Sequence, residues 1–158
     1  MPAASRVMRL RVLTPAEAGE GRCLDGSPPA YYSAPAASSA NSSWLIVLKG
    51  GGWCFDRYAC RYRSLNFNEG SSTGLPRTKS LGGLLSGSAQ VNPTFAHWHR
   101  VFVWYCDGAS FTGDRSAPLI VANRSLWFRG RAALDAVVQH LLRHKGLAKA
   151  SGQASRRS

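Results

Sequence analysis

The stretch Gly50-Gly51-Gly52-Trp53-Cys54 follows directly on the apolar run Trp44-Leu-Ile-Val-Leu48, and the two together decide how this chain is interpreted. A short, continuous apolar run is typical of a strand that is covered on both faces. Three consecutive glycines allow the backbone to turn sharply after that strand and leave its N–H groups uncovered by side chains. Such N–H groups stabilise the negative oxygen that develops during acyl transfer. The stretch is therefore either an ordinary tight turn or one wall of an ester-cleaving site.

Three other segments have the periodicity of regular secondary structure. Residues 8–12 alternate between apolar residues and arginine, which predicts a half-exposed strand. The apolar run 101–105 predicts a second buried strand, which ends at Cys106-Asp107-Gly108. Residues 125–145 carry apolar side chains on one helical face, and Gly146 is suited to end that helix.

Two long segments and both ends of the chain lack such periodicity. Residues 15–35 and 49–100 are rich in Gly, Ser and Pro, which predicts irregular structure, and the second segment is long enough to carry function. Residues 1–6 and the polar, basic tail 150–158 are predicted to be disordered. A helix after a buried strand normally returns the chain to a parallel neighbouring strand, but no apolar run follows Gly146.

The composition indicates one basic domain with a core. The chain has 158 residues, of which 44% are hydrophobic, and its net charge is +12. Such an excess favours a polyanionic partner: nucleic acid, an anionic membrane surface or an acidic polysaccharide. An arginine-rich codon usage produces the same excess. The basic residues are scattered without a nucleic-acid-binding motif, and no apolar run reaches membrane-spanning length, so we expect neither nucleic acid nor a membrane as partner. The sequence does not determine the oligomeric state.

The four cysteines share one property, which is that none forms a C-x-x-C pair. They are Cys23, Cys54, Cys60 and Cys106. Their spacing excludes metal ribbons and thioredoxin-like sites, and leaves buried thiols or disulfides. Glycosylation sequons at Asn41 and Asn123 favour secretion and hence disulfides. However, Arg9 and Arg11 interrupt the apolar residues near the start, so a secretion leader is not visible.

Several blocks of sequence, in order, have the residues of a known family. They are Cys23-Leu-Asp-Gly-Ser-Pro-Pro-Ala-Tyr-Tyr32, residues 44–54, Gly82-Gly-Leu-Leu-Ser86 with Val91-Asn-Pro93, residues 98–114 including Tyr105-Cys-Asp-Gly-Ala-Ser-Phe-Thr-Gly113, and Phe128-Arg-Gly130. These blocks resemble the pectin acetylesterases and their Notum-like relatives. The resemblance extends from about residue 7 to residue 149. It implies an α/β-hydrolase-like fold with a mostly parallel sheet and long irregular loops, secretion to the extracellular space or cell wall, and removal of acetyl esters from pectin.

The resemblance also implies that this chain is incomplete as an enzyme. The family uses a Ser-Asp-His triad in that order, and its serine lies on the strand that follows the helix ending here at Gly146. We find none of the three in this sequence. We therefore expect a partial domain over residues 7–149, truncated before the nucleophile strand, which is inactive alone and requires no cofactor. Two alternatives are a non-catalytic cationic module that binds acidic polysaccharide and an unstable product of a truncated gene.

Site residues follow from the same resemblance. It implies that Gly51 and Gly52 are oxyanion donors, with a further set of residues around the pocket: Gly50, Trp53, Tyr105, Asp107 and Ser110. A core position for Trp53 is the alternative. It also implies disulfides Cys54–Cys60 and Cys23–Cys106. Lys49 departs from the family, which commonly has Glu before the glycines.

Three further patterns suggest chemistry that their context opposes. Asp107 and Ser110 look like a catalytic pair, but Asp-Gly after a strand is turn chemistry. The segment Gly70-Ser-Ser-Thr-Gly74 satisfies G-x-S-x-G without a strand before it or a helix after it, so we interpret it as a coincidence. His140 and His144 are four residues apart on the predicted helix but lack the Glu of a zinc motif, and we predict no metal site.

Overall fold

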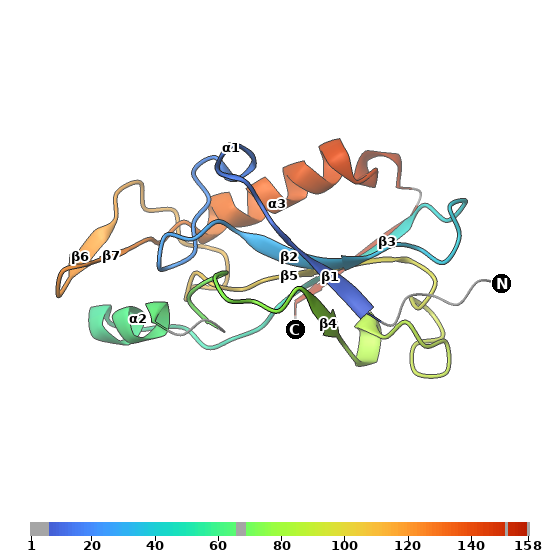
Figure 1. Ribbon diagram of the computed structural model, residues 1–158, viewed down its shortest axis with the longest axis horizontal. Coiled ribbons are helices and arrows are strands. Elements are labelled where there is room, and N and C mark those ends of the chain that lie inside the picture. The colour runs from blue at the N-terminus through green and yellow to red at the C-terminus, as the bar shows by residue number, and fades with distance from the viewer. Residues whose placement is uncertain (1–6, 66–68, 151, 158) are drawn as a thin grey trace.

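A six-stranded mixed sheet with the strand order β4-β1-β2-β5-β3-β8 organises the protein (Figure 1). This computed structural model describes residues 7–65, 69–150 and 152–157, so the predicted disordered start, residues 1–6, lies outside it. The strands of the sheet are β1 (Val7–Val12), β2 (Ala30–Ala34), β3 (Ser43–Leu48), β4 (Thr78–Ser80), β5 (His99–Val103) and β8 (Gly152–Arg157). Strands β5, β3 and β8 are parallel, whereas β4, β1, β2 and β5 pair in antiparallel fashion.

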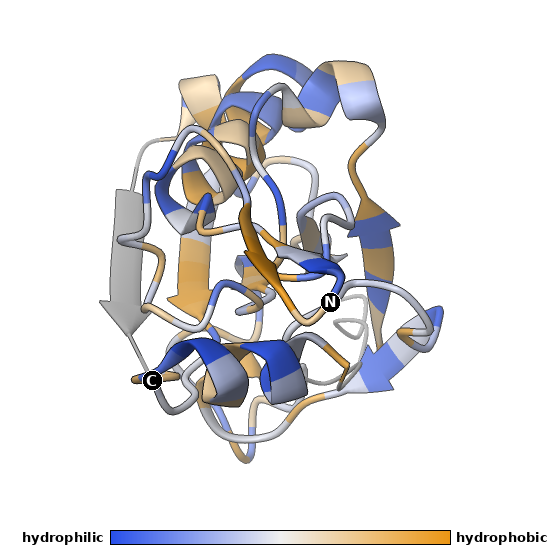
Figure 2. Cartoon of the chain, turned by 90° about the vertical axis from the view of Figure 1, so that its left-hand side faces the viewer, coloured by the Kyte–Doolittle hydropathy of each residue, from blue (hydrophilic) through white to orange (hydrophobic). Residues whose placement is uncertain are grey.

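Helices and a hairpin surround this sheet. They are α1 (Pro15–Ala18), α2 (Arg57–Ser64), α3 (Gly130–His144), the short 3₁₀ helices η1 (Gly83–Leu85) and η2 (Leu147–Lys149), and the hairpin of β6 (Leu119–Val121) and β7 (Arg124–Leu126). Figure 1 shows α3 and α1 above the sheet, with α2 and the hairpin at one end. Figure 2 faces that end, where apolar strands lie behind a hydrophilic α2. The α/β class predicted from the sequence is confirmed. No helix in the described ranges is long and apolar enough to span a bilayer.

Each face of the sheet has its own core because successive strand residues point to opposite sides. The core beneath α3 includes Tyr31, Trp44, Val101, Val137 and Leu141. The core on the other face includes Met8, Tyr32, Leu45, Leu85 and Trp104. Adjacent residues such as Tyr31 and Tyr32 thus belong to different cores, which is why most residues of β2, β3 and β5 are apolar on both faces of the sheet.

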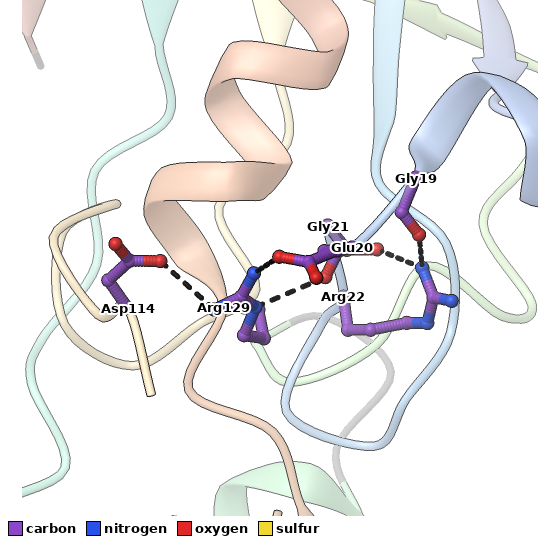
Figure 3. A network of polar contacts seen from close by, with 6 residues as sticks. All are labelled: Gly19, Glu20, Gly21, Arg22, Asp114 and Arg129. Carbon is purple, nitrogen blue, oxygen red and sulfur yellow. Dashed lines mark hydrogen bonds and ion pairs between the residues drawn. The ribbon is translucent and has the colours of Figure 1, made fainter. Parts of the chain in front are cut away.

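A buried arginine joins α3 to the loop that follows α1 (Figure 3). The Arg129 side chain, 7% exposed, pairs with the Glu20 carboxylate and donates to Asp114 Oδ1 at 3.1 Å. Arg22 lies opposite Arg129 in an isolated β-bridge and donates to the carbonyl oxygens of Gly19 and Gly21. These contacts fix where α3 begins relative to the N-terminal loop.

Several element boundaries differ from those predicted. The helix begins at Gly130 instead of residue 125, because residues 124–126 form β7. A turn with positive φ at Ala122 and Asn123, 45° and 62°, closes that hairpin, and such turns match the twist of paired strands. The second buried strand is shifted to His99–Val103, and the segments predicted to be irregular contain α1, β2, α2 and β4.

The predicted disordered tail is also a strand over most of its length. Residues Gly152 to Arg157 form β8, which pairs in parallel with β3 from Ser43 to Leu48. The prediction of disorder rested on composition, which describes only the side chains. The pairing of β8 with β3 is made by backbone N–H and C=O groups, which every non-proline residue carries.

Helices α1 and α3 meet at a buried histidine. His140 is 5% exposed, and its Nδ1 lies 3.3 Å from Glu17 Oε1. Its ring also lies 5.9 Å from that of Tyr31 and 5.0 Å from that of His144. Burial lowers the pKa of His140, an effect that Glu17 opposes and that the charges of Arg11, His144 and Lys145 reinforce. The neutral imidazole is therefore the form that this packing accepts.

We expect the protein to lose stability in mild acid because of His140. A lowered folded-state pKa means that the unfolded chain binds the proton more tightly, so stability is full above pH 6.5 and falls as the pH drops below it. Urea unfolding at a series of pH values measures this loss. His140→Leu should reduce the fall just below pH 6.5 without removing it, because burial also lowers the pKa of His99, and His144→Gln should retain it in full. The pKa of Glu17 is lowered to about 2, so the stability that this carboxylate contributes is lost only below pH 4.5. An unchanged slope in His140→Leu would contradict the assignment.

Candidate functional site

The glycine-rich loop leaves the sheet at the carboxyl end of β3. The last ladder contact on this side is the bond from the Lys49 amide to Val103 O, 3.0 Å. Residues 50–55 have no regular secondary structure, and Gly51 and Gly52 are exposed. Within the described part of the chain, neither amide donates to a protein acceptor. Two adjacent N–H groups are thus available at the edge where parallel strands of α/β proteins place their ligands.

Tyr105, just beyond β5, supports this loop from below. A Cβ atom at Gly51 would lie 2.5 Å from two carbons of the Tyr105 ring, so only glycine allows the observed approach. The Tyr105 hydroxyl donates to Gly52 O at 3.1 Å and accepts from the Ser110 amide at 3.2 Å. Burial raises the pKa of Tyr105, which keeps this hydroxyl protonated as a donor. The Gly52–Trp53 peptide group is therefore held by a fixed partner.

Trp53 lies at the rim of the loop and is not a core residue. Its indole is 63% exposed, and Nε1 donates to Ser110 Oγ at 2.6 Å. Ser110 and Phe111 have φ values of 52° and 62°. This rare left-handed turn aims the Ser110 hydroxyl at the indole. The Ser110 side chain thus positions Trp53.

Asp107 is buried beneath the same turn, with 1% exposure. Its Oδ1 accepts from the Phe111 amide at 3.1 Å. Burial raises the pKa of Asp107, and hydrogen bonds from the backbone at Phe111, Ala109 and Gly113 oppose that rise. A Cβ atom at Gly130 would lie 1.8 Å from Oδ2, so α3 can begin here only with glycine. Asp107 thus joins the turn to α3, and its contacts favour turn chemistry over a catalytic pair with Ser110.

Two disulfides fix the loop and the end of β5. The predicted pairs Cys54–Cys60 and Cys23–Cys106 are both confirmed. The Cys54 amide donates to Gly108 O at 3.0 Å, which attaches the loop directly to the turn after β5. Cys23–Cys106 spans 83 residues, a loop for which the chain-entropy model gives a stabilisation of about 4.5 kcal/mol. The covalent links therefore converge on the segments that carry Gly51 and Tyr105.

Arg63, on α2, is a member of the site that sequence reasoning missed. Its guanidinium is 12% exposed, and Nη1 lies 3.5 Å from Glu69 Oε2. Cβ atoms at Gly51 and Gly52 would lie 3.8 and 3.5 Å from its two terminal nitrogens. The guanidinium therefore lies against the two candidate donors. Its place depends on how α2 packs under the loop, and no local motif signals that packing.

Lys49 adds a second positive charge beside the glycines. Its Nζ donates to Gly50 O at 3.3 Å and lies 4.9 Å from the centre of the Trp104 ring. Burial lowers the pKa of Lys49, while Glu69 raises it and Lys79 and Arg63 lower it. A positive field under the loop favours the charge of an oxyanion.

The remaining sequence motifs lie outside this arrangement. Ser72 of the G-x-S-x-G match lies in the segment that connects α2 to β4. It is buried, and its amide donates to Ser27 Oγ at 2.9 Å. It follows no strand and precedes no helix, so the match is a coincidence. His140 faces α1, and the described residues contain no group of three His, Cys, Asp or Glu side chains able to hold a metal ion. His99, at the start of β5, borders a cavity with Trp44 and Lys145 at the end of the strands opposite the loop.

Comparisons with known proteins agree with the observed fold. The family described as Pectinacetylesterase matches residues 2–153. Pectin acetylesterase 11 of Arabidopsis thaliana is 37% identical over 92% of this chain and 36% of its own length. The palmitoleoyl-protein carboxylesterase NOTUM of Schmidtea mediterranea is 33% identical over 81% of this chain and 24% of its own. The solved structure of the Wnt deacylase Notum from Drosophila superposes with a TM-score of 0.81 and 27% identity, over 96% of this chain and 42% of that one. The chain thus spans about a third of the length of the curated relatives it matches.

We predict that the two exposed glycines differ in their tolerance of a methyl group. Gly51→Ala forces a Cβ into the Tyr105 ring and should lower the free energy of unfolding by about 1–3 kcal/mol. Gly52→Ala meets Arg63 Nη2 at an ordinary contact distance of 3.5 Å and should change it by less than about 1 kcal/mol. Chemical denaturation of both variants tests this difference. Equal losses would show that Tyr105 does not support the loop.

Proposed function

The chain belongs to the pectinacetylesterase family, and we propose that it supplies the oxyanion-binding half of a carboxylic-ester hydrolase site within a longer protein. One observation carries this proposal: the adjacent amides of Gly51 and Gly52 lie outside the sheet ladder and are braced by Tyr105. In the whole protein, a serine attacks the ester carbonyl while a histidine takes its proton. The Gly51 and Gly52 amides donate to the resulting oxyanion. The sugar hydroxyl then leaves, and water releases the acid from the acyl-serine.

The proposed substrate is an acetyl ester of pectin, the substrate for which the Arabidopsis relatives are named. We place the protein outside the cell, where two disulfides persist. Strand β8 follows α3, the place in the chain that the family resemblance gives to the nucleophile strand, and it pairs with β3. The sequence of β8, Gly152-Gln-Ala-Ser-Arg-Arg157, has no serine between glycines. We propose that another part of the whole protein supplies the attacking group.

A cationic module without catalytic activity is the second candidate. The net charge of +12 favours an acidic polysaccharide as its ligand. Both candidates place the same chain on the same polymer, and they differ in whether an ester is cleaved. The assay below separates them when it is applied to this chain and to the whole protein.

We predict that the purified chain has oxyanion donors but no esterase turnover. Aryl acetate hydrolysis should stay at background, and turnover abolished by a serine-directed inhibitor would contradict the proposal. Acetate, whose carboxylate mimics the oxyanion, should shift the amide resonances of Gly51 and Gly52 in a ¹⁵N-resolved NMR titration. Gly19 and Gly146, also exposed, serve as controls and should not shift. Equal shifts at all four glycines would exclude a specific donor pair.

Glycosylation is predicted at Asn123 and not at Asn41. Asn123 is exposed in the turn between β6 and β7. The Asn41 amide nitrogen donates to His97 O at 3.0 Å, and its Oδ1 accepts from the Ser43 amide at 2.9 Å, so its side chain is occupied. Secretion of the chain from eukaryotic cells, followed by glycosidase treatment, should reveal one glycan. Asn123→Gln should remove it, Asn41→Gln should retain it, and the reverse pattern would refute the assignment.

A further inference from the structure

Among the described residues, exposed aromatic side chains gather in one short segment. Of the aromatic residues that the structure describes, those with largely exposed side chains all lie between positions 53 and 62. They are Trp53, Phe55, Tyr58 and Tyr62, with exposures of 63, 90, 60 and 76%. Aromatic rings are usually buried, and a group of them on a surface marks an interaction site.

The geometry of α2 places part of this group on one helical face. Tyr58 and Tyr62 are four residues apart, so their rings project from the same side of the helix. Trp53 and Phe55 precede the helix in the loop that Cys54–Cys60 ties to it. The Asp56 carboxylate accepts from the Tyr58 and Ala59 amides, which fixes the start of the helix. The rings are thus presented by a rigid support.

Arginines accompany the rings. Arg57 is exposed, and its guanidinium lies 4.9 Å from the centre of the Tyr58 ring. Arg61 follows one turn later and is half-buried, with its Nε enclosed and without a hydrogen-bond acceptor among the described residues. The segment 49–65 contains four basic residues and a single acidic one, Asp56, whose carboxylate caps the helix. Figure 2 shows α2 as a hydrophilic ribbon at the front of the molecule. We call Trp53, Phe55, Arg57, Tyr58, Arg61 and Tyr62 the aromatic–arginine face.

We propose that the aromatic–arginine face is a docking surface for a polyuronate chain, which it holds beside the glycine-rich loop. The apolar C–H face of a pyranose ring packs on an aromatic ring, and each uronate carboxylate accepts from a guanidinium. The positive field extends from α2 to Arg63 and Lys49 under the glycines, so a polyanion is favoured along the whole path. Because Trp53 belongs to both the face and the loop, a bound polymer lies next to the candidate oxyanion donors.

This inference rests on the proposed function, because it supplies the polymer that carries the ester. It adds a binding surface that is separate from the reacting atoms. The face presents both rings, on which sugars pack, and guanidinium groups, which bind carboxylates, and a polymer with a carboxylate on every sugar uses both. A nucleic acid or a second copy of this chain would use the same face differently, and the test distinguishes both.

The test measures the affinity of the purified chain for fluorescein-labelled oligogalacturonate without acetyl groups, by anisotropy at low and physiological salt. Tyr58→Ser/Tyr62→Ser and Arg57→Ser/Arg61→Ser should each weaken binding about tenfold. Arg143→Ser/Lys145→Ser removes two charges from the exposed end of α3 and is the matched control, with an expected change below about twofold. Tyr58→Phe/Tyr62→Phe keeps the rings and should bind as the parent does, and near-ultraviolet circular dichroism verifies the fold of each variant.

Several outcomes would overturn the proposal. If Arg143→Ser/Lys145→Ser weakens binding as much as Arg57→Ser/Arg61→Ser does, the effect is one of net charge alone. Equal affinity for fully methyl-esterified oligogalacturonate, or tighter binding of single-stranded DNA, would remove the preference for uronate. If sedimentation shows that Tyr58→Ser/Tyr62→Ser only dissociates a dimer, the face joins two copies of the chain. Because the ligand carries no ester, failure here leaves the acetate titration at Gly51 and Gly52 unaffected, and the converse also holds.

Discussion

The close approach of the Tyr105 ring to Gly51 is the contact on which the candidate site depends. It requires a residue without Cβ at position 51, and it places the Tyr105 hydroxyl within reach of Gly52 O. The same hydroxyl accepts from the Ser110 amide, while the Ser110 side chain holds the Trp53 indole. A single buried phenol therefore connects the loop after β3 to the turn after β5. This bracing leaves two N–H groups fixed in direction, which is the preorganisation that oxyanion stabilisation needs.

The parallel pairing of β3 and β5 makes this contact possible. Leu48 lies opposite Val103 in the register, so both strands end at the same level and their following loops meet. Asp107 and Gly130 then place the start of α3 against the same turn, and Arg129 joins that start to the N-terminal loop. Two disulfides reinforce these junctions. The rigid parts of the molecule thus converge on the end of the sheet that carries the glycines, whereas the four histidines lie away from it.

Positive charge is concentrated at the same end of the sheet. Arg63 and Lys49 lie under the glycines, and Arg57 and Arg61 lie on the neighbouring helix. The opposing carboxylates in this region are engaged, Glu69 with Arg63 and Asp56 as the cap of α2. The field that favours an oxyanion at Gly51 and Gly52 therefore continues onto the surface where exposed rings gather. In the proposed function, the same group of positive charges therefore favours the oxyanion at the glycines and the polyanion on the aromatic–arginine face.

The sequence by itself determined the two buried strands, the helix before Gly146, the glycine turn and, through family resemblance, both disulfide pairs. These features are encoded locally, in apolar periodicity, in residues without Cβ and in ordered blocks of motif. Only the tertiary structure decided that Arg63 lies against the glycines, that Asp107 packs against Gly130 at the start of α3, that Trp53 is exposed and that residues 152–157 pair with β3. The physical reason is that these contacts join residues distant in sequence, or use backbone groups common to all residues, so no local pattern specifies them.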